Sequence, residues 1–149
     1  AMLKETIDTA YLHFNRAKDN YDEILQMPID VEIYSDKERI KTIDAFIFRF
    51  IKLQDFMGNK LFRVILNKIG EYEDHMSLID VLDKMEKLNI IADADNWIEF
   101  RAVRNKLTHE YPDNREDVID GIKLAMIYFK EISDILQGIT HYIQKKHLL

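Results

Sequence analysis

Apolar residues recur along most of this chain at intervals of three and four positions, which is the spacing of an α-helix with one buried face. The long runs of this kind cover residues 3–24, 40–65 and 118–143. Shorter runs cover residues 78–85 and 97–103, and strand-like alternation is hard to find. The pattern therefore predicts an all-α fold, an antiparallel up-and-down helical bundle of about five helices.

Turn and capping residues between these runs mark the expected helix ends. Pro28 follows the first run and Gly70 follows the second, and both residue types commonly end helices. Ser77 and Asp80 have the spacing of a capping box at the start of the third helix. Gly58 lies inside the second run, where we expect it to weaken or bend a long helix. The remaining predicted caps are Asp93 or Asp95 for the fourth helix and Asn114 for the fifth.

Length and composition narrow the class of protein. The chain has 149 residues, of which 47% are hydrophobic and 32% charged, so we expect one globular domain covering residues 1–149. It has no cysteine, which excludes disulfides and thiolate sites. No apolar run is long enough to span a membrane, and the N-terminal residues do not resemble a signal peptide. We therefore expect a cytoplasmic protein with no membrane partner.

The sequence RNKLTHEY, which begins at Arg104, gathers polar and titratable side chains where the fourth helix should end. Asn105 and His109 share one face of a helix, whereas Arg104 and His109 diverge by about 140°. Pro112 disfavours a helical conformation at Tyr111, so the helix should end near His109 and allow its ring to turn toward Arg104. A less specific interpretation is that Arg104 and His109 only cap free carbonyl groups at the helix end.

Charge restricts how this protein could bind nucleic acid. The net charge of −6 argues against nonspecific coating of nucleic acid, which needs a basic surface. Arg101, Arg104 and Lys106 nevertheless form a local basic group, with no acid among them before Glu110. Any nucleic acid is therefore expected to bind at this local group and not along a whole face.

The loop predicted after the second helix contains several possible metal ligands. Adjacent residues on a loop seldom converge on one ion, and no second histidine or aspartate lies nearby at helical ligand spacing. We interpret this segment as a solvated loop between helices, and we expect neither a metal site nor a cofactor. The side chains concerned are Glu71, Glu73, Asp74 and His75.

The eight-residue sequence RNKLTHEY resembles the signature of the HEPN superfamily, and in particular of its HepT-like toxin branch. That signature is an arginine, four residues, a histidine, one residue and a tyrosine, here Arg104, His109 and Tyr111. The polar residue that usually follows the arginine is present as Asn105. The motif also ends the penultimate long helix of an all-helical chain, as in the family, and a final helix follows. The stiff junction between Tyr111 and Pro112 is a mild departure.

This resemblance implies a metal-independent endoribonuclease that acts as the toxin of a toxin–antitoxin pair. Members of the family work as homodimers, in which the motifs of two chains line one cleft. Their usual antitoxin is a minimal nucleotidyltransferase encoded next to the toxin. In some HepT-like pairs this partner attaches AMP to the motif tyrosine, here Tyr111, and silences the nuclease.

The residues themselves suit this chemistry. Cleavage of RNA by its own 2′-OH needs a base for that hydroxyl and an acid for the leaving 5′-oxygen. Histidine titrates near neutral pH, so His109 can serve in either role. Arg104 can hold the scissile phosphate, and Asn105 can orient His109 or bind a phosphate oxygen. Arg101 and Lys106 are the candidate RNA-binding residues outside this catalytic group.

Two other functions remain open from the sequence. The first is a noncatalytic helical protein that presents substrate to a partner nucleotidyltransferase. Relatives of that kind share the bundle but generally lack an intact motif, and here Arg104, His109 and Tyr111 are all present. The second is a helical adaptor that binds another helix in a groove. The apolar runs do not exceed what a core requires, so the adaptor function ranks last.

Overall fold

The computed structural model describes residues 2–108 and 115–149, and within these ranges the chain is helical and contains no strand. This confirms the predicted all-α fold. A 3-10 turn, η1 (Val31–Ser35), precedes α2, and a π turn, η2 (Met57–Leu61), joins α2 to α3. The α-helices are α1 (Met2–Ile24), α2 (Lys37–Phe56), α3 (Phe62–Lys68), α4 (Leu78–Lys87), α5 (Ala94–Thr108) and α6 (Arg115–Lys145).

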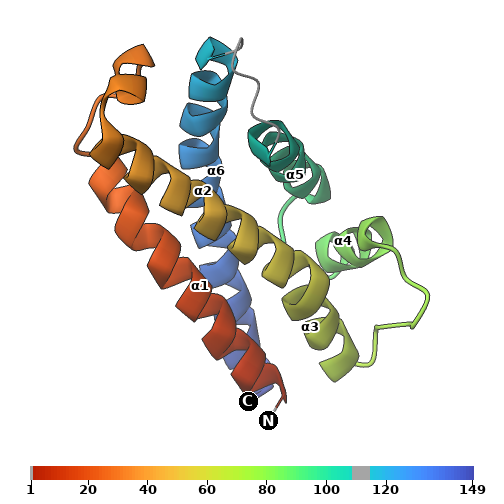
Figure 1. Cartoon of the computed structure of the whole chain (residues 1–149). Helices are drawn as coiled ribbons and strands as arrows, with labels where there is room; N and C mark the ends of the chain where they lie inside the picture. Colours follow the sequence, from red (N-terminus) through yellow and green to blue (C-terminus); the bar gives the residue numbers. More distant parts are fainter. Residues whose placement is uncertain (1, 109–114) are drawn as a thin grey trace.

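The helices run alternately up and down in one bundle (Figure 1). α1 and α2 form an antiparallel pair, and α2 continues through η2 into α3. The short helix α4 leads into α5, which forms a second antiparallel pair with α6. Within the described residues, no helix combines the length and the apolar character that crossing a bilayer requires.

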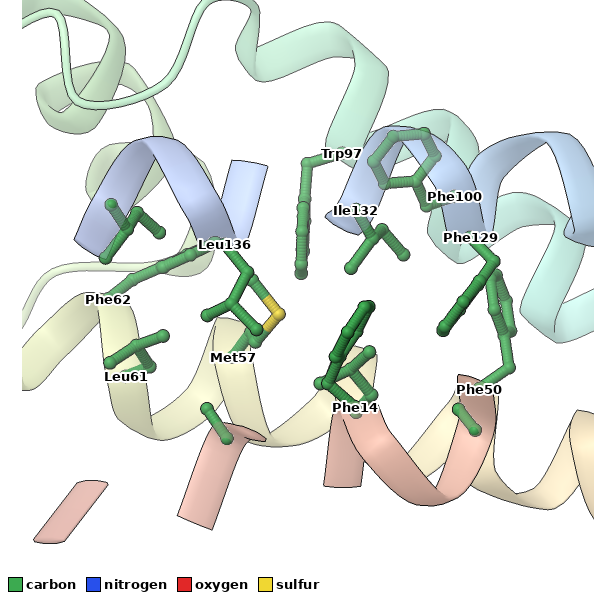
Figure 2. Packing of buried hydrophobic residues seen from close by; sticks show 14 of the residues in the cluster. Phe14, Phe50, Met57, Leu61, Phe62, Trp97, Phe100, Phe129, Ile132 and Leu136 are labelled. Carbon is green, nitrogen blue, oxygen red and sulfur yellow. The ribbon is translucent and has the colours of Figure 1, made fainter. Parts of the chain in front are cut away.

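Large apolar side chains from all six helices meet in one core, part of which is shown in Figure 2. Phe14 of α1 stacks on Phe129 of α6, with ring centroids 5.3 Å apart and planes 8° apart. Phe62 of α3 and Phe100 of α5 meet the Trp97 ring edge to face, at centroid distances of 4.8 and 5.6 Å. Burying one such side chain contributes about 1.5–3 kcal/mol relative to leaving it exposed, so this cluster holds α5 firmly against α3.

Two predicted helix ends have the expected geometry. The hydroxyl of Ser77 accepts a hydrogen bond from the Asp80 amide, and the Asp80 carboxylate accepts one from the Ser77 amide, each at 3.1 Å. This reciprocal pair is the capping box predicted at the start of α4. Gly70 follows the end of α3 with a φ of 77°, and the Glu71 amide donates to the Leu66 carbonyl at 2.8 Å. The left-handed backbone at this position explains why a glycine ends the helix.

Helix α5 decides between the two predicted caps and corrects one detail of the sequence interpretation. Asp93, and not Asp95, supplies the side chain at the start of the helix, because its carboxylate accepts the Asp95 amide at 2.8 Å. Ile98 belongs to the fourth apolar run but is 40% exposed, whereas Leu107, beyond that run, is buried. The buried face of α5 therefore extends past the run of apolar residues and into the motif. Asn114, the predicted cap of α6, lies outside the described residues.

Gly58 lies in the π turn η2, so the long second helix widens at this position and is not interrupted. An added Cβ at Gly58 would lie 3.3 Å from Nε1 of Trp97. The glycine therefore allows the indole ring of α5 to approach the backbone of η2. The sequence identified the irregular position, and in the structure this position lies at a close contact between two helices.

Candidate functional site

The described part of the motif occupies the last turns of α5, which ends at Thr108. Arg101, Asn105 and Lys106 are exposed there, and Arg104 is half-buried. His109 and Tyr111, the predicted catalytic histidine and modification site, lie outside the described residues. The structure therefore describes the part of the candidate site that surrounds Arg104.

Arg104 is bound by an acid from another helix. Its Nη2 donates a hydrogen bond to Oδ2 of Asp55 at 3.1 Å, and the two residues are 49 positions apart in the chain. Asp55 lies at the end of α2, so the pair joins α2 to α5. Both side chains are partly exposed, so the ion pair contributes at most about 1 kcal/mol to folding. Its main effect is to restrict the orientation of the guanidinium group.

The packing of α5 explains why Arg104 meets Asp55. The buried face of α5 carries Val103, directly before Arg104, and Leu107, one turn after it. An added Cβ at Gly121 of α6 would lie only 3.0 Å from Cδ2 of Leu107. The absence of a side chain at Gly121 thus lets the end of α5 approach α6 closely. Arg104 reaches Asp55 of α2 from this closely packed part of α5.

The helical geometry separates the predicted RNA-binding residues. Arg101, Arg104 and Asn105 lie within about one turn and share a face of α5. Lys106 projects about 160° away from Arg104 around the helix, on the side that faces Gly121 of α6. Arg101 and Asn105 can therefore act together with Arg104 on one ligand. RNA binding by Arg101 and Lys106 stays a prediction.

Asp55 is the site residue that sequence reasoning missed. Helical spacing links residues only within a few turns, so it cannot connect positions that are 49 residues apart. One signal was present in the sequence, because Asp55 is the only acid between Asp44 and Glu71. A carboxylate that is isolated in an otherwise acid-free stretch, here residues 45–70, indicates that a specific partner lies nearby.

An apolar cavity of about 380 Å³ opens near the same end of the bundle, between η1, α2 and α6. Leu107 and Arg115, which flank the segment outside the described residues, both line it. The guanidinium carbon of Arg115 lies 4.7 Å from the centre of the Tyr34 ring of η1. Leu107 thus lines the cavity and also packs against Gly121 of α6, so the cavity adjoins the end of α5 that carries the motif.

The loop between α3 and α4 contains the acidic and histidine residues considered as metal ligands. Glu71 pairs with Lys84 at 3.3 Å, and Glu73 lies 3.5 Å from Nε2 of His75. Within residues 2–108 and 115–149, no group of three or more histidine, aspartate or glutamate side chains is arranged to hold a metal ion. Glu71 and Glu73 have local side-chain partners instead.

Comparison of this chain with protein-family models, curated proteins and solved structures finds no match. The observations that bear on function are therefore the motif that begins at Arg104 and the ion pair that Arg104 forms with Asp55.

Proposed function

We propose that this protein is a metal-independent endoribonuclease of the HEPN type and acts as the toxin of a toxin–antitoxin pair. The observation that carries the proposal is the Arg104–Asp55 pair. It orients a half-buried guanidinium at the first position of the RNKLTHEY motif, in the last turns of α5. A capping role alone would not require a carboxylate from a second helix to hold this arginine.

The proposed reaction needs only groups of the protein and the RNA. The 2′-OH loses its proton to a base and its oxygen bonds to the adjacent phosphorus, which gives a 2′,3′-cyclic phosphate. The bond from phosphorus to the 5′-oxygen breaks, and that oxygen receives a proton from an acid. His109 supplies the base or the acid. Arg104 binds the phosphate oxygens on which negative charge develops, and Asn105 orients His109 or binds a phosphate oxygen.

The orientation of Arg104 by Asp55 supports this role in energetic terms. A long arginine side chain loses conformational freedom when it binds a phosphate. Asp55 already restricts that freedom, so less entropy is lost on binding RNA. The same contact holds the planar guanidinium in one orientation, and the reaction depends on accurate placement of the phosphate.

A homodimer fits the chemistry, because each chain contributes one motif histidine while the reaction uses an acid and a base. Two copies of His109 in one cleft would supply both, and two copies of Arg104 would double the local positive charge. An overall charge of −6 makes that concentration of cations useful for binding RNA. The partner proposed for neutralisation is a minimal nucleotidyltransferase that attaches AMP to Tyr111.

The test is cleavage of a labelled single-stranded RNA in buffer containing EDTA. We expect cleavage by the native protein, with products that end in a 2′,3′-cyclic phosphate, and loss of cleavage by at least about 100-fold in Arg104→Ala and His109→Ala. Arg39→Ala, which breaks a comparable ion pair with Asp36 on the surface of α2, is the matched control.

Equal cleavage by native protein and His109→Ala would overturn the nuclease assignment. Absence of cleavage together with stable binding of a nucleotidyltransferase would favour the noncatalytic partner instead.

A further inference from the structure

The helices α1 and α2 carry matching stretches without acidic residues. No aspartate or glutamate occurs in residues 9–18 of α1 or in residues 45–54 of α2. Both stretches carry basic residues, so they are locally positive in a chain with 27 acids and a net charge of −6. The antiparallel packing of α1 against α2 brings them near one another. His13 of the first stretch lies against Phe56, two residues beyond the second, with ring centroids 5.4 Å apart.

The basic side chains of these stretches lie close to one another. Burial lowers the pKa of His13 below its ordinary value, and the positive charges of Arg16, Arg49 and Lys52 lower it further. The side chains of His13 and Arg16 in α1 and of Arg49 and Lys52 in α2 thus lie close enough for the three cations to affect the pKa of His13. Within the described residues, Arg16, Arg49 and Lys52 form no ion pair with an acid. Asp19 lies one turn from Arg16 and Asp55 one turn from Lys52, so acids lie near these cations without forming an ion pair with them.

An aromatic ring is exposed beside these cations. Phe48 of α2 is 53% exposed and projects on the side of the helix opposite its core-facing residues. The guanidinium carbon of Arg49 lies 5.2 Å from the centre of the Phe48 ring, and Nζ of Lys52 lies 5.5 Å from it. An exposed ring next to cations is the combination that proteins use to stack an unpaired base and bind its phosphates.

This surface leads toward Arg104. Phe48, Lys52 and Asp55 occur at successive turns on one face of α2, and Asp55 binds Arg104. Phe48 and Asp55 are separated by about 10 Å along the helix axis at 1.5 Å per residue. That distance corresponds to roughly three nucleotides of a stacked strand at about 3.4 Å each. A strand whose phosphate lies at Arg104 would therefore reach Phe48 within a few nucleotides.

We propose that His13, Arg16, Phe48, Arg49 and Lys52 form a single-stranded RNA subsite, named here the α1–α2 subsite. Phe48 stacks on an unpaired base, and Arg16, Arg49 and Lys52 bind the phosphates that flank it. His13 offers a ring nitrogen as a hydrogen-bonding group. The proposal rests on the proposed nuclease function, because it extends the RNA path away from Arg104. A symmetric contact between two copies of this surface would bring like charges together, which opposes its use as a dimer interface.

Binding of a cleavage-resistant RNA tests the subsite separately from catalysis. The probe is a fluorescent 12-nucleotide 2′-O-methyl oligouridylate, which lacks the reactive 2′-OH but keeps its bases and phosphates. We expect Phe48→Ala to raise its Kd by about 5- to 150-fold. We also expect Arg49→Ala and Lys52→Ala each to lower the slope of log Kd against log salt by about 0.7.

The matched controls lie away from the α1–α2 subsite. Ile127→Ala removes another exposed apolar side chain, which is 57% exposed on α6, and Lys41→Ala removes a lysine near the start of α2. Both should bind the probe as the native protein does. A duplex of the same length should bind more weakly, because its bases are not available for stacking.

The two proposals fail in different ways. Weak or absent binding of the probe by native protein, or native binding by Phe48→Ala and Lys52→Ala, overturns the α1–α2 subsite whether or not the protein cleaves RNA. If these variants lose binding as expected but the native protein does not cleave ordinary RNA, the α1–α2 subsite stands and the proposed nuclease function is overturned. A drop in self-association in Phe48→Ala with unchanged RNA binding would assign this surface to a second copy of the chain.

Discussion

The carboxylate of Asp55 and the guanidinium of Arg104 meet at 3.1 Å across the contact between α2 and α5. Arg104 itself is proposed to touch the RNA, and Asp55 is proposed to act through Arg104 as a positioning residue. This difference in role can be measured. Loss of the Asp55 carboxylate should weaken RNA cleavage, whereas loss of the Arg104 guanidinium should abolish it.

Asp55→Asn should lower kcat for RNA cleavage by about 10- to 100-fold with a smaller change in KM. The free energy of unfolding should fall by no more than about 1 kcal/mol, because the pair is partly exposed. Asp55→Glu, which restores the charge, should recover part of the rate. Steady-state kinetics and urea unfolding provide the two measurements, and Asp8→Asn, which breaks a surface pair with Lys4, is the control. An unchanged rate in Asp55→Asn would remove Asp55 from the site.

Gly58→Ala should destabilise the fold by about 1–2 kcal/mol, because the new methyl group would press on the buried Trp97 ring. Gly138→Ala is the matched control, since nothing lies within 4 Å of a Cβ added there in α6. That control should gain about 0.5–1 kcal/mol from helix propensity. Urea unfolding of both variants gives the comparison. Stabilisation of similar size in both would show that the contact with Trp97 does not constrain position 58.

His13 should make stability depend on pH. Its pKa is lowered in the folded protein from an ordinary value of 6.5, so the unfolded chain binds a proton more readily. The folded state is therefore disfavoured as the pH falls through 6.5, and its full stability is present above that value. His13→Gln should reduce the loss of unfolding free energy between neutral and mildly acidic pH. His75→Gln, in the loop between α3 and α4, serves as the control. A loss identical in native protein and His13→Gln would contradict the prediction.

The nuclease should be active only as a dimer. Sedimentation at micromolar concentration should show a two-fold species, because the proposed cleft needs His109 from both chains. The specific activity should fall on dilution below the dissociation constant of the dimer. A monomer with full cleavage activity would exclude the shared cleft while leaving the single-chain chemistry open.

Tyr111→Phe should keep substantial cleavage activity but escape neutralisation by the partner nucleotidyltransferase. An AMP group on Tyr111 would place a phosphate and a base near Arg104, where they would compete with RNA for the guanidinium. Intact mass spectrometry after co-expression measures the modification. Native protein should gain one or more AMP units and Tyr111→Phe none. Inhibition of native protein without any added mass would mean that the partner neutralises by binding alone.

Local patterns predicted local structure in this chain. The spacing of apolar residues identified the helices, and the pair Ser77 and Asp80 identified the start of α4 correctly, because both signals act within one or two turns. The contact between Asp55 and Arg104 and the contact between Gly58 and Trp97 join different helices. Such contacts depend on how helices pack, and no helical period along the sequence contains that information. The histidine and tyrosine of the motif stay predictions.

The order of the helices has a consequence for how activity arises during folding. The most extensive contacts join α1 to α2 and α5 to α6, which are neighbours along the chain, and contacts of this kind form early and fast. The ion pair between Asp55 and Arg104 instead connects these two hairpins. A partly folded chain can therefore contain both hairpins and still lack an oriented arginine. We expect ribonuclease competence to be acquired only when the two hairpins dock, so that an incompletely assembled toxin would be harmless to the RNA around it.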